Sequence, residues 1–140
     1  MRLDSGEARR RFASARVARL ATVRPDGAPH LVPVVFAAVG DTIHTAVDAK
    51  PKSTTGLQRL ANLRTEPRCT LLVDHYDDDW DRLWWVRADG RATVLEQPAH
   101  DHPGMAALRD RYAPYATRPP PGPLVVVEVE RWSGWAATAA

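Results

Sequence analysis

Short turn signals between runs of β-branched residues constrain the fold of this chain more than any other feature. The tripeptide PDG at 25–27 separates ARLATVR from PHLVPVVFAAV, and the dipeptide GD at 40–41 separates that second run from TIHTAV. Apolar runs joined by short turns that contain Gly and Asp are typical of antiparallel hairpins. The spacing therefore predicts an antiparallel meander of three strands between residues 17 and 47.

Three further segments have strand character. RCTLLVDHY at 68–76 predicts a fourth strand, and RLWWVRADGRATVLE at 82–96 predicts either one long bent strand or a hairpin. The closing run LVVVEVERWSGWAA alternates Val with Glu128 and Glu130, so one face of this last strand is expected to be wet.

Helical signals lie between these strands. DSGEARRRFASAR is amphipathic, with Asp4 or Ser5 as a plausible N-cap, and residues 98–112 form a second helical segment. A further helix is expected in GLQRLANLRTEP, where one face carries Leu57, Leu60, Ala61 and Leu63.

These elements predict a single domain over residues 1–140. The expected class is mainly β (α+β): a six- to seven-stranded antiparallel β-barrel with two or three short peripheral helices. So many strands in a short chain tend to close into a barrel, because closure removes exposed edges.

Composition excludes several classes of protein. The formal net charge is +2, and the seventeen arginines are dispersed, which argues against nucleic-acid binding. No signal peptide or membrane span is apparent, so a cytoplasmic location and no membrane partner are expected. Cys69 is the one cysteine, and its setting CTLLV predicts a buried, unreactive thiol.

Both lysines of the chain flank one proline, in the segment KPKSTTGL that begins at Lys50. Ammonium groups, hydroxyls and a following helix N-terminus are the donors that a phosphate requires. The same residues also fit ordinary helix capping and a solvated loop, and both interpretations remain open on these residues alone. A Walker loop is excluded because its glycines are absent.

The order of segments across the chain resembles a known family. ATVRPDGAPHLVPVVF, HTAVDAKPKSTTGLQRLANLRTEPRCTLLVD and W-x-x-x-WWVRADGRATVLE are together similar to the split-barrel superfamily of flavin and deazaflavin enzymes. Within it, the chain resembles the coenzyme F-420-dependent branch related to pyridoxine 5'-phosphate oxidase. The resemblance implies that the barrel is a six- to seven-stranded antiparallel split β-barrel, and that the protein is a homodimer with the cofactor between the two subunits.

The resemblance also implies a set of cofactor-binding residues. The cofactor phosphate would be held by Lys50, Pro51, Lys52, Ser53, Thr54 and Thr55. The ring system would lie along the second strand near His30, Val32, Pro33 and Val34, with Val47 beneath it. Asn62 would reach the cofactor tail, and Trp80 would cover the cofactor from the next loop.

Two departures from the family pattern bear on the cofactor. Flavin-binding relatives commonly carry an arginine where this chain has Val32, which favours a deazaflavin (coenzyme F-420) over the alternative, FMN. Deazaflavin relatives often place two basic residues after the proline, whereas here Lys52 follows Pro51 and Lys50 precedes it.

The function implied is hydride transfer between coenzyme F-420 and a small unsaturated or conjugated organic substrate. Such chemistry requires positioning and exclusion of water more than a strong acid or base, and no catalytic residue is assigned, although His30 and Tyr76 are candidate proton donors. The alternative is a non-catalytic carrier or sequestering protein for a deazaflavin, a flavin (FMN) or a tetrapyrrole. No metal site is expected, since neither His100-Asp101-His102 nor the acidic run at 74–81 has ligand spacing.

Five tryptophans are many for this length. Trp84 and Trp85 are adjacent in a predicted strand, so their rings should point to opposite faces. The outward ring, together with Trp132 and Trp135, suggests a subunit contact or a reach toward the partner's cofactor, with ordinary core packing as the alternative.

Overall fold

The computed structural model describes residues 1–47 and 54–138, and for residues 54–57 it describes the backbone alone. The elements, in chain order, are α1 (Ser5–Ser14), β1 (Ala18–Val23), β2 (Pro29–Val34), β3 (Ala37–Val39), β4 (Thr42–Ala46), α2 (Thr54–Thr65), β5 (Arg68–His75), the 3-10 turn η1 (Trp80–Arg82), β6 (Trp84–Leu95), α3 (Pro103–Arg111), α4 (Ala113–Thr117) and β7 (Leu124–Ala136).

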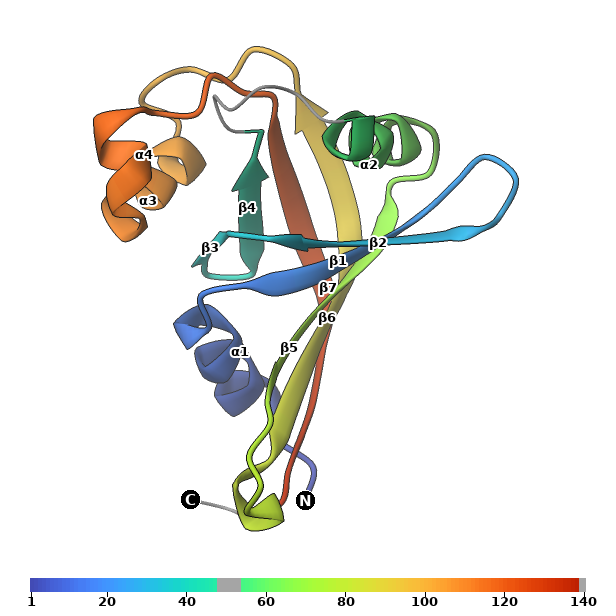
Figure 1. The fold of residues 1–140 in the computed structure, drawn as a ribbon, viewed down its shortest axis with the longest axis vertical. Coiled ribbons are helices and arrows are strands. Elements are labelled where there is room, and N and C mark those ends of the chain that lie inside the picture. Colours follow the sequence, from blue (N-terminus) through green and yellow to red (C-terminus); the bar gives the residue numbers. More distant parts are fainter. Residues whose placement is uncertain (48–53, 139–140) are drawn as a thin grey trace.

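One seven-stranded sheet forms the frame of the protein. Its strand order is β2-β1-β5-β6-β7-β4-β3, and all the strand pairs are antiparallel. Figure 1 shows this sheet curling on itself, with α1 near the middle, α2 at one end and the two termini at the other end. The predicted split barrel with short helices is confirmed.

The three-stranded meander was predicted wrongly in one respect. The run at 29–39 does not form one strand, because it divides into β2, which pairs with β1, and β3, which pairs with β4 at the opposite edge of the sheet. Side chains satisfy the backbone at the break: Thr45 Oγ1 donates to the Val35 carbonyl at 2.8 Å, and the Phe36 N–H donates to the Tyr112 hydroxyl at 3.1 Å. Phe36 itself is fully buried.

The larger apolar cluster lies between α1 and the concave inner face of the sheet. Phe12 of α1 packs on Phe36 at 4.9 Å and on Trp132 at 5.3 Å between ring centroids. The helix begins as predicted, because the Asp4 carboxylate accepts a 2.8 Å hydrogen bond from the Glu7 N–H. In α2, Leu60 and Leu63 are buried as expected but Ala61 is exposed, and the Leu57 side chain lies outside the described residues.

A smaller apolar cluster lies on the other side of β3 and β4. It joins Met105 and Leu108 of α3 and Tyr115 of α4 to Ala46 and Leu124 of the sheet. The helical segment expected at 98–112 therefore begins later, at Pro103, and is followed by the separate short helix α4.

The two long strands pair with each other in the middle of the sheet and show the features predicted from their sequences. β6 is one long strand with an irregularity between Asp89 and Gly90, which confirms the bent strand rather than the hairpin. A Cβ atom at Gly90 would lie 2.3 Å from the Glu128 carbonyl oxygen, so this position requires glycine. Glu128 and Glu130 of β7 are exposed, which confirms that one face of this strand is in contact with solvent.

Candidate functional site

Most of the predicted phosphate segment cannot be placed. Lys50, Pro51, Lys52 and Ser53 lie outside the described residues, and Thr54 and Thr55 begin α2 without described side chains. The elements on either side are described. β4 ends at Ala46, and the next residue, Val47, packs against the core and donates its N–H to the Pro123 carbonyl at 3.1 Å.

The predicted ring-binding residues of β2 fall on two faces of the sheet. His30, Val32 and Val34 are buried on the inner face, where they pair with inward-facing residues of β1. Pro33 is exposed on the outer face, beside Leu31. A planar ring could therefore contact the side chains of one set or of the other, but not all four at once.

The free edge of β2 offers mostly hydrogen-bond acceptors. The Arg24 N–H donates to the Ala28 carbonyl at 2.9 Å, which makes this a hydrogen-bonded pair, and the pairing alternates from there along the strand. Pro29, Leu31 and Pro33 therefore direct their backbone groups away from β1. Because proline has no N–H, Leu31 supplies the single outward amide donor of this strand, among three outward carbonyls.

His30 has an unusual polar environment. It is 7% exposed, and its Nδ1 is buried without a hydrogen-bond partner among the described residues. Burial, followed by the positive charges of Arg24 and Arg59, lowers the pKa of His30. The ring is therefore neutral at pH 7 and lies near two cations, a setting that favours an anionic or hydrogen-bonding ligand.

Asn62 lies next to this position, through Thr22. Its side-chain nitrogen donates to Thr22 Oγ1 at 3.0 Å, and its oxygen accepts from the Gln58 side chain at 2.7 Å. Thr22 in turn lies directly opposite His30 in the β1–β2 pair. The structure thus brings two predicted site residues, His30 and Asn62, together around a buried threonine.

No sequence pattern singled out Thr22, Arg24 or Arg59 as site residues. The register of the hairpin around the PDG turn places residue 22 opposite residue 30, so Thr22 was accessible to a register argument. The approach of Arg59 to His30 depends on how α2 packs on β1, and no local pattern encodes that packing.

Trp80 lies far from these residues in one copy of the chain. It belongs to η1, is 68% exposed, and its indole N–H lies 3.4 Å from the Tyr76 hydroxyl. Figure 1 shows that the turn between β5 and β6 is at the end of the sheet opposite α2. Trp80 could therefore cover a ligand near α2 only from a second copy of the chain.

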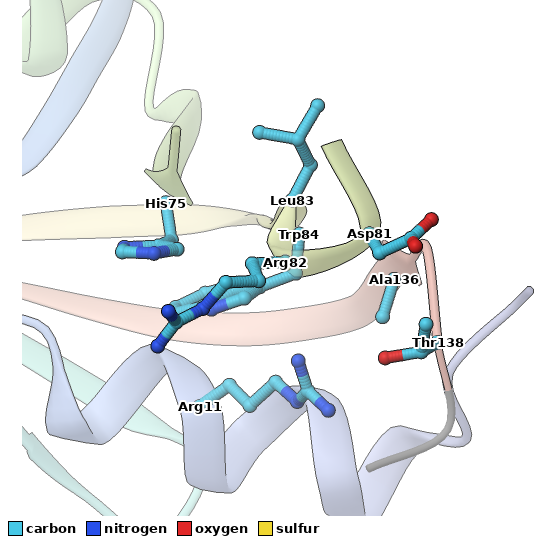
Figure 2. A pocket seen from close by; sticks show the side chains of 8 residues that line it. All are labelled: Arg11, His75, Asp81, Arg82, Leu83, Trp84, Ala136 and Thr138. Carbon is cyan, nitrogen blue, oxygen red and sulfur yellow. The ribbon is translucent and has the colours of Figure 1, made fainter. Parts of the chain in front are cut away.

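A recess of 360 Å³ lies near this turn (Figure 2). Trp84 forms one wall, with His75 stacked 6.4 Å from its ring centroid and the Arg11 guanidinium 5.5 Å from it. Arg11 is already paired with Glu7 at 3.0 Å, so its charge is compensated. The recess offers an aromatic surface without a strong net charge.

Other reactive groups are excluded by their surroundings. Burial, followed by the charge of Asp89, raises the pKa of the Cys69 thiol to about 12, so it stays protonated and cannot act as a nucleophile. His102 caps α3, with its Nδ1 accepting from the Gly104 N–H at 3.0 Å. Over residues 1–47 and 54–138, no group of three or more His, Cys, Asp or Glu side chains could hold a metal ion. No helix in this part of the chain could span a membrane.

The two adjacent tryptophans point to opposite faces, as predicted. Trp84 packs against the inner core, whereas Trp85 lies beside Trp135 on the outer face. Trp132 is turned inward, and its indole donates to Asp41 at 2.9 Å.

The chain matches a family model and shares its fold with solved structures. A family model described as "Pyridoxamine 5'-phosphate oxidase" matches residues 5–136. No curated protein matches the sequence.

Solved structures share the fold. A conserved hypothetical protein from Mycobacterium tuberculosis is 26% identical, with a TM-score of 0.73 over 96% of this chain and 86% of that one. A FAD-binding protein from Mesorhizobium loti is 22% identical, with a TM-score of 0.69 over 96% and 93% of the two chains. A haem-binding protein from Mycobacterium smegmatis is also 22% identical, with a TM-score of 0.69 over 95% of this chain and 57% of that one.

Proposed function

Because this chain belongs to the pyridoxamine 5'-phosphate oxidase family, we propose that it is an oxidoreductase that binds a flavin-type cofactor. The cofactor proposed is coenzyme F-420, with hydride transfer to or from a small unsaturated or conjugated organic substrate. The observation that carries this proposal is the family match over residues 5–136, a span that contains the two-lysine segment between β4 and α2.

The choice of a deazaflavin over FMN rests on Val32. Val32 is 6% exposed and packs in the core opposite Leu20, so it offers no positive charge where flavin-binding relatives commonly carry an arginine. Arg24 and Arg59 lie near the neighbouring His30 and supply a positive field there. These two charges would attract any anionic group, so the preference for a deazaflavin rests on Val32 alone.

The residues of the chain would bind and orient rather than react. The bound deazaflavin supplies the hydride chemistry. Lys50 and Lys52 hold its phosphate, and His30 offers a ring nitrogen without a partner among the described residues. The hydrogen bond from Asn62 to Thr22 joins α2 to β1, and Gln58 orients the Asn62 side chain, so the helix that follows the two-lysine segment is held against the sheet.

The proposed cofactor site lies between two copies of the chain. The turn between β5 and β6, which carries Trp80, is at the end of the sheet opposite α2 in one copy (Figure 1), so a covering Trp80 would come from the partner. The outer surface of β1 and β2 carries exposed apolar side chains suited to such a contact, including Leu31, which is 66% exposed, and Val23, which is 39% exposed.

A binding titration tests the cofactor assignment. The purified protein is titrated with coenzyme F-420 and with FMN while tryptophan fluorescence is followed. We expect tighter binding of F-420, and we expect Lys50→Ala and Lys52→Ala each to weaken it about tenfold, as loss of a charge-assisted hydrogen bond would. Arg118→Ala is the matched control, because Arg118 is exposed at the end of α4. Tighter binding of FMN, or unchanged F-420 affinity in both lysine variants, would refute the assignment.

A non-catalytic carrier for a deazaflavin, a flavin or a tetrapyrrole is the second candidate. It is favoured by the solved structure of a haem-binding protein that shares this fold, because haem is a tetrapyrrole. A turnover screen with chemically reduced cofactor separates the two functions. Turnover of any enone or quinone supports the enzyme, and failure across enones, quinones and tetrapyrroles, despite tight cofactor binding, supports the carrier.

A further inference from the structure

A recess on the outer face of β6 and β7 has the lining of a binding site, and the proposed function does not use it. Its volume is 560 Å³, within the range of roughly 300–1,000 Å³ that small-molecule sites occupy. Its lining includes Arg2, Trp85, Arg87, Arg131, Ser133 and Trp135.

Strand register explains why these side chains meet. Trp85 of β6 lies directly opposite Trp135 of β7, and Arg2 of the N-terminal segment bridges to Trp135 from the other side. Residues directly opposite each other in an antiparallel pair point to the same face. Arg87 and Ser133 form the next row in the same way. Two indoles therefore lie side by side, with guanidinium and hydroxyl groups next to them.

The charge in this recess is positive and incompletely compensated. Arg87 lies 3.4 Å from a carboxylate oxygen of Asp89 and 5.4 Å from the Trp85 ring centroid. Across the part of the chain that the structure describes, neither Arg2 nor Arg131 forms an ion pair. The acid that lines the recess is Asp4, and its carboxylate is already engaged in capping α1.

An apolar recess adjoins the cationic one. It has a volume of 480 Å³, and its lining shares Trp85, Arg87 and Trp135 with the first recess. The remaining wall includes Leu72 and Leu83, and also Asp74, whose carboxylate lies 3.8 Å from the Arg19 guanidinium. The indole pair thus has a mainly apolar surface on one side and, on the other, Arg2 and Arg131, which form no ion pair among the described residues.

We propose that this double recess binds a small aromatic molecule that carries a carboxylate or phosphate group. The ring of the ligand lies against Trp85 and Trp135, and its anionic group faces Arg2 and Arg131. Tryptophan faces and arginine guanidinium groups recognise these two parts of such a ligand. The recess is at the end of the sheet that holds both termini, whereas α2 is at the other end (Figure 1), so within one copy of the chain it lies apart from the segment proposed to hold the cofactor phosphate.

Three probes test separately whether the aromatic ring and the anionic group of the ligand contribute to binding. The full chain, without cofactor, is titrated by calorimetry with 1-naphthyl phosphate, 1-naphthol and inorganic phosphate, while the indole N–H signals are followed by nuclear magnetic resonance. We expect 1-naphthyl phosphate to bind at least about tenfold more tightly than either fragment, and to shift the signals of Trp85 and Trp135. Tenfold corresponds to about 1.4 kcal/mol.

Two variants test the arginines. Arg131→Gln and Arg2→Gln should each weaken 1-naphthyl phosphate about tenfold, because each removes one charge-assisted contact. Both side chains belong to exposed residues, so the fold should persist, and Arg118→Gln is the matched control that should bind normally. Equal binding of naphthol and naphthyl phosphate, or equal affinity in all three variants, would overturn the proposal. Failure of every probe to bind would also overturn the proposal. If the protein then has the mass of a dimer, and Trp135→Ala lowers that mass toward the mass of a monomer, the occupant of the recess is a second copy of the chain.

Discussion

His44 shows how one buried side chain can fix a helix onto the sheet. It lies on β4, is 4% exposed, and its Nε2 is 3.0 Å from the Thr42 hydroxyl, which itself donates to the Val39 carbonyl at 2.7 Å. Because the Thr42 hydroxyl donates its proton to that carbonyl, it can only accept a hydrogen bond from His44. The neutral His44 ring therefore carries its proton on Nε2. Its Nδ1 is buried without a partner among the described residues and faces Gly104 of α3.

Protonation of His44 should oppose docking of α3. Burial, followed by the charge of His102, whose ring centroid lies 5.9 Å away, lowers the pKa of His44. The ordinary pKa of histidine is about 6.5, so below that pH the unfolded chain binds a proton that the folded chain does not. The free energy of unfolding should thus fall as pH decreases below about 6.5, by at most about 1.4 kcal/mol per pH unit for this group. His30, whose pKa is also lowered, contributes with the same sign.

Urea unfolding at pH 7.5 and 5.5 tests this expectation. These pH values avoid the carboxylates, whose pKa values are lowered by their arginine partners at Glu7, Glu66 and Glu96. We expect the wild-type protein to lose stability at pH 5.5 and His44→Gln to lose less. An identical loss in both proteins would show that His44 is not the group responsible.

The same contact predicts a strong steric effect at Gly104. A Cβ atom there would lie 2.3 Å from His44 Nδ1, and the ring cannot retreat because it is packed between β4 and α3. Gly104→Ala should therefore lower the free energy of unfolding by about 1–3 kcal/mol, the usual cost of overpacking. Gly6→Ala is the matched control in α1, where the new atom would lie 3.5 Å from its nearest neighbour. We expect that variant to be as stable as the wild type or more stable by up to about 1 kcal/mol.

Residues at the end of α3 contact the segment between β2 and β3, where the chain crosses from one edge of the sheet to the other. Arg111 donates to the carbonyls of Phe36 and Ala15, and its guanidinium lies 4.8 Å from the Phe36 ring centroid. The neighbouring Tyr112 hydroxyl accepts from the Phe36 N–H and lies within hydrogen-bond distance of the Phe36 and Arg16 carbonyls. Two side chains thus satisfy backbone groups that have no strand partner.

Removal of the Tyr112 hydroxyl should weaken this junction. Tyr112→Phe leaves the Phe36 N–H without its partner, and an unsatisfied buried donor costs about 1–3 kcal/mol. Chemical denaturation measures the loss. Tyr76→Phe removes the same atom from a residue that is 67% exposed, so its effect should stay within about 0.5 kcal/mol. Equal effects of the two substitutions would mean that the junction does not depend on this hydroxyl.

These junction contacts explain which parts of the fold could be predicted. Turn dipeptides and alternating burial patterns are local, and they correctly indicated most strands, the first helix and the bend in β6. The division of the run at 29–39 was missed, because the contacts that satisfy Val35 and Phe36 come from Thr45 and from Tyr112, far away in sequence. A continuous apolar run carries no signal for such distant partners.

The candidate site also has one part that local sequence patterns predict and another that they do not. Periodicity alone predicts that His30, Val32 and Val34 share a face and that Pro33 does not, as the structure shows. The proximity of His30 to Asn62 depends on helix packing and came from family resemblance rather than from spacing. The outer recess with its arginines went unpredicted, because Arg2, Arg87 and Arg131 meet only through strand register.

The outer surface of β1 and β2 carries exposed apolar side chains at the edge of the sheet. Leu31 is 66% exposed, the most of any large apolar side chain within a strand of the described sheet, and it lies opposite Ala21 near Val23. Its strand is an edge strand, and Pro29 and Pro33 remove two of the donors that could otherwise recruit a further strand. An edge protected from strand addition but covered with apolar side chains suits face-to-face packing against another copy.

Leu31→Glu should therefore shift a dimer toward monomer. A buried, unpaired carboxylate on each side of a two-fold interface would weaken association by at least about tenfold, since each costs several kcal/mol to desolvate. Sedimentation velocity across a concentration series measures the change, and coenzyme F-420 affinity should fall with it if, as proposed, the covering Trp80 comes from the partner. Val39→Glu is the matched control: Val39 is 46% exposed at the far edge, on β3, and its substitution should leave the mass unchanged. A wild-type protein that stays monomeric at all concentrations yet binds F-420 tightly would place the whole cofactor site within one chain.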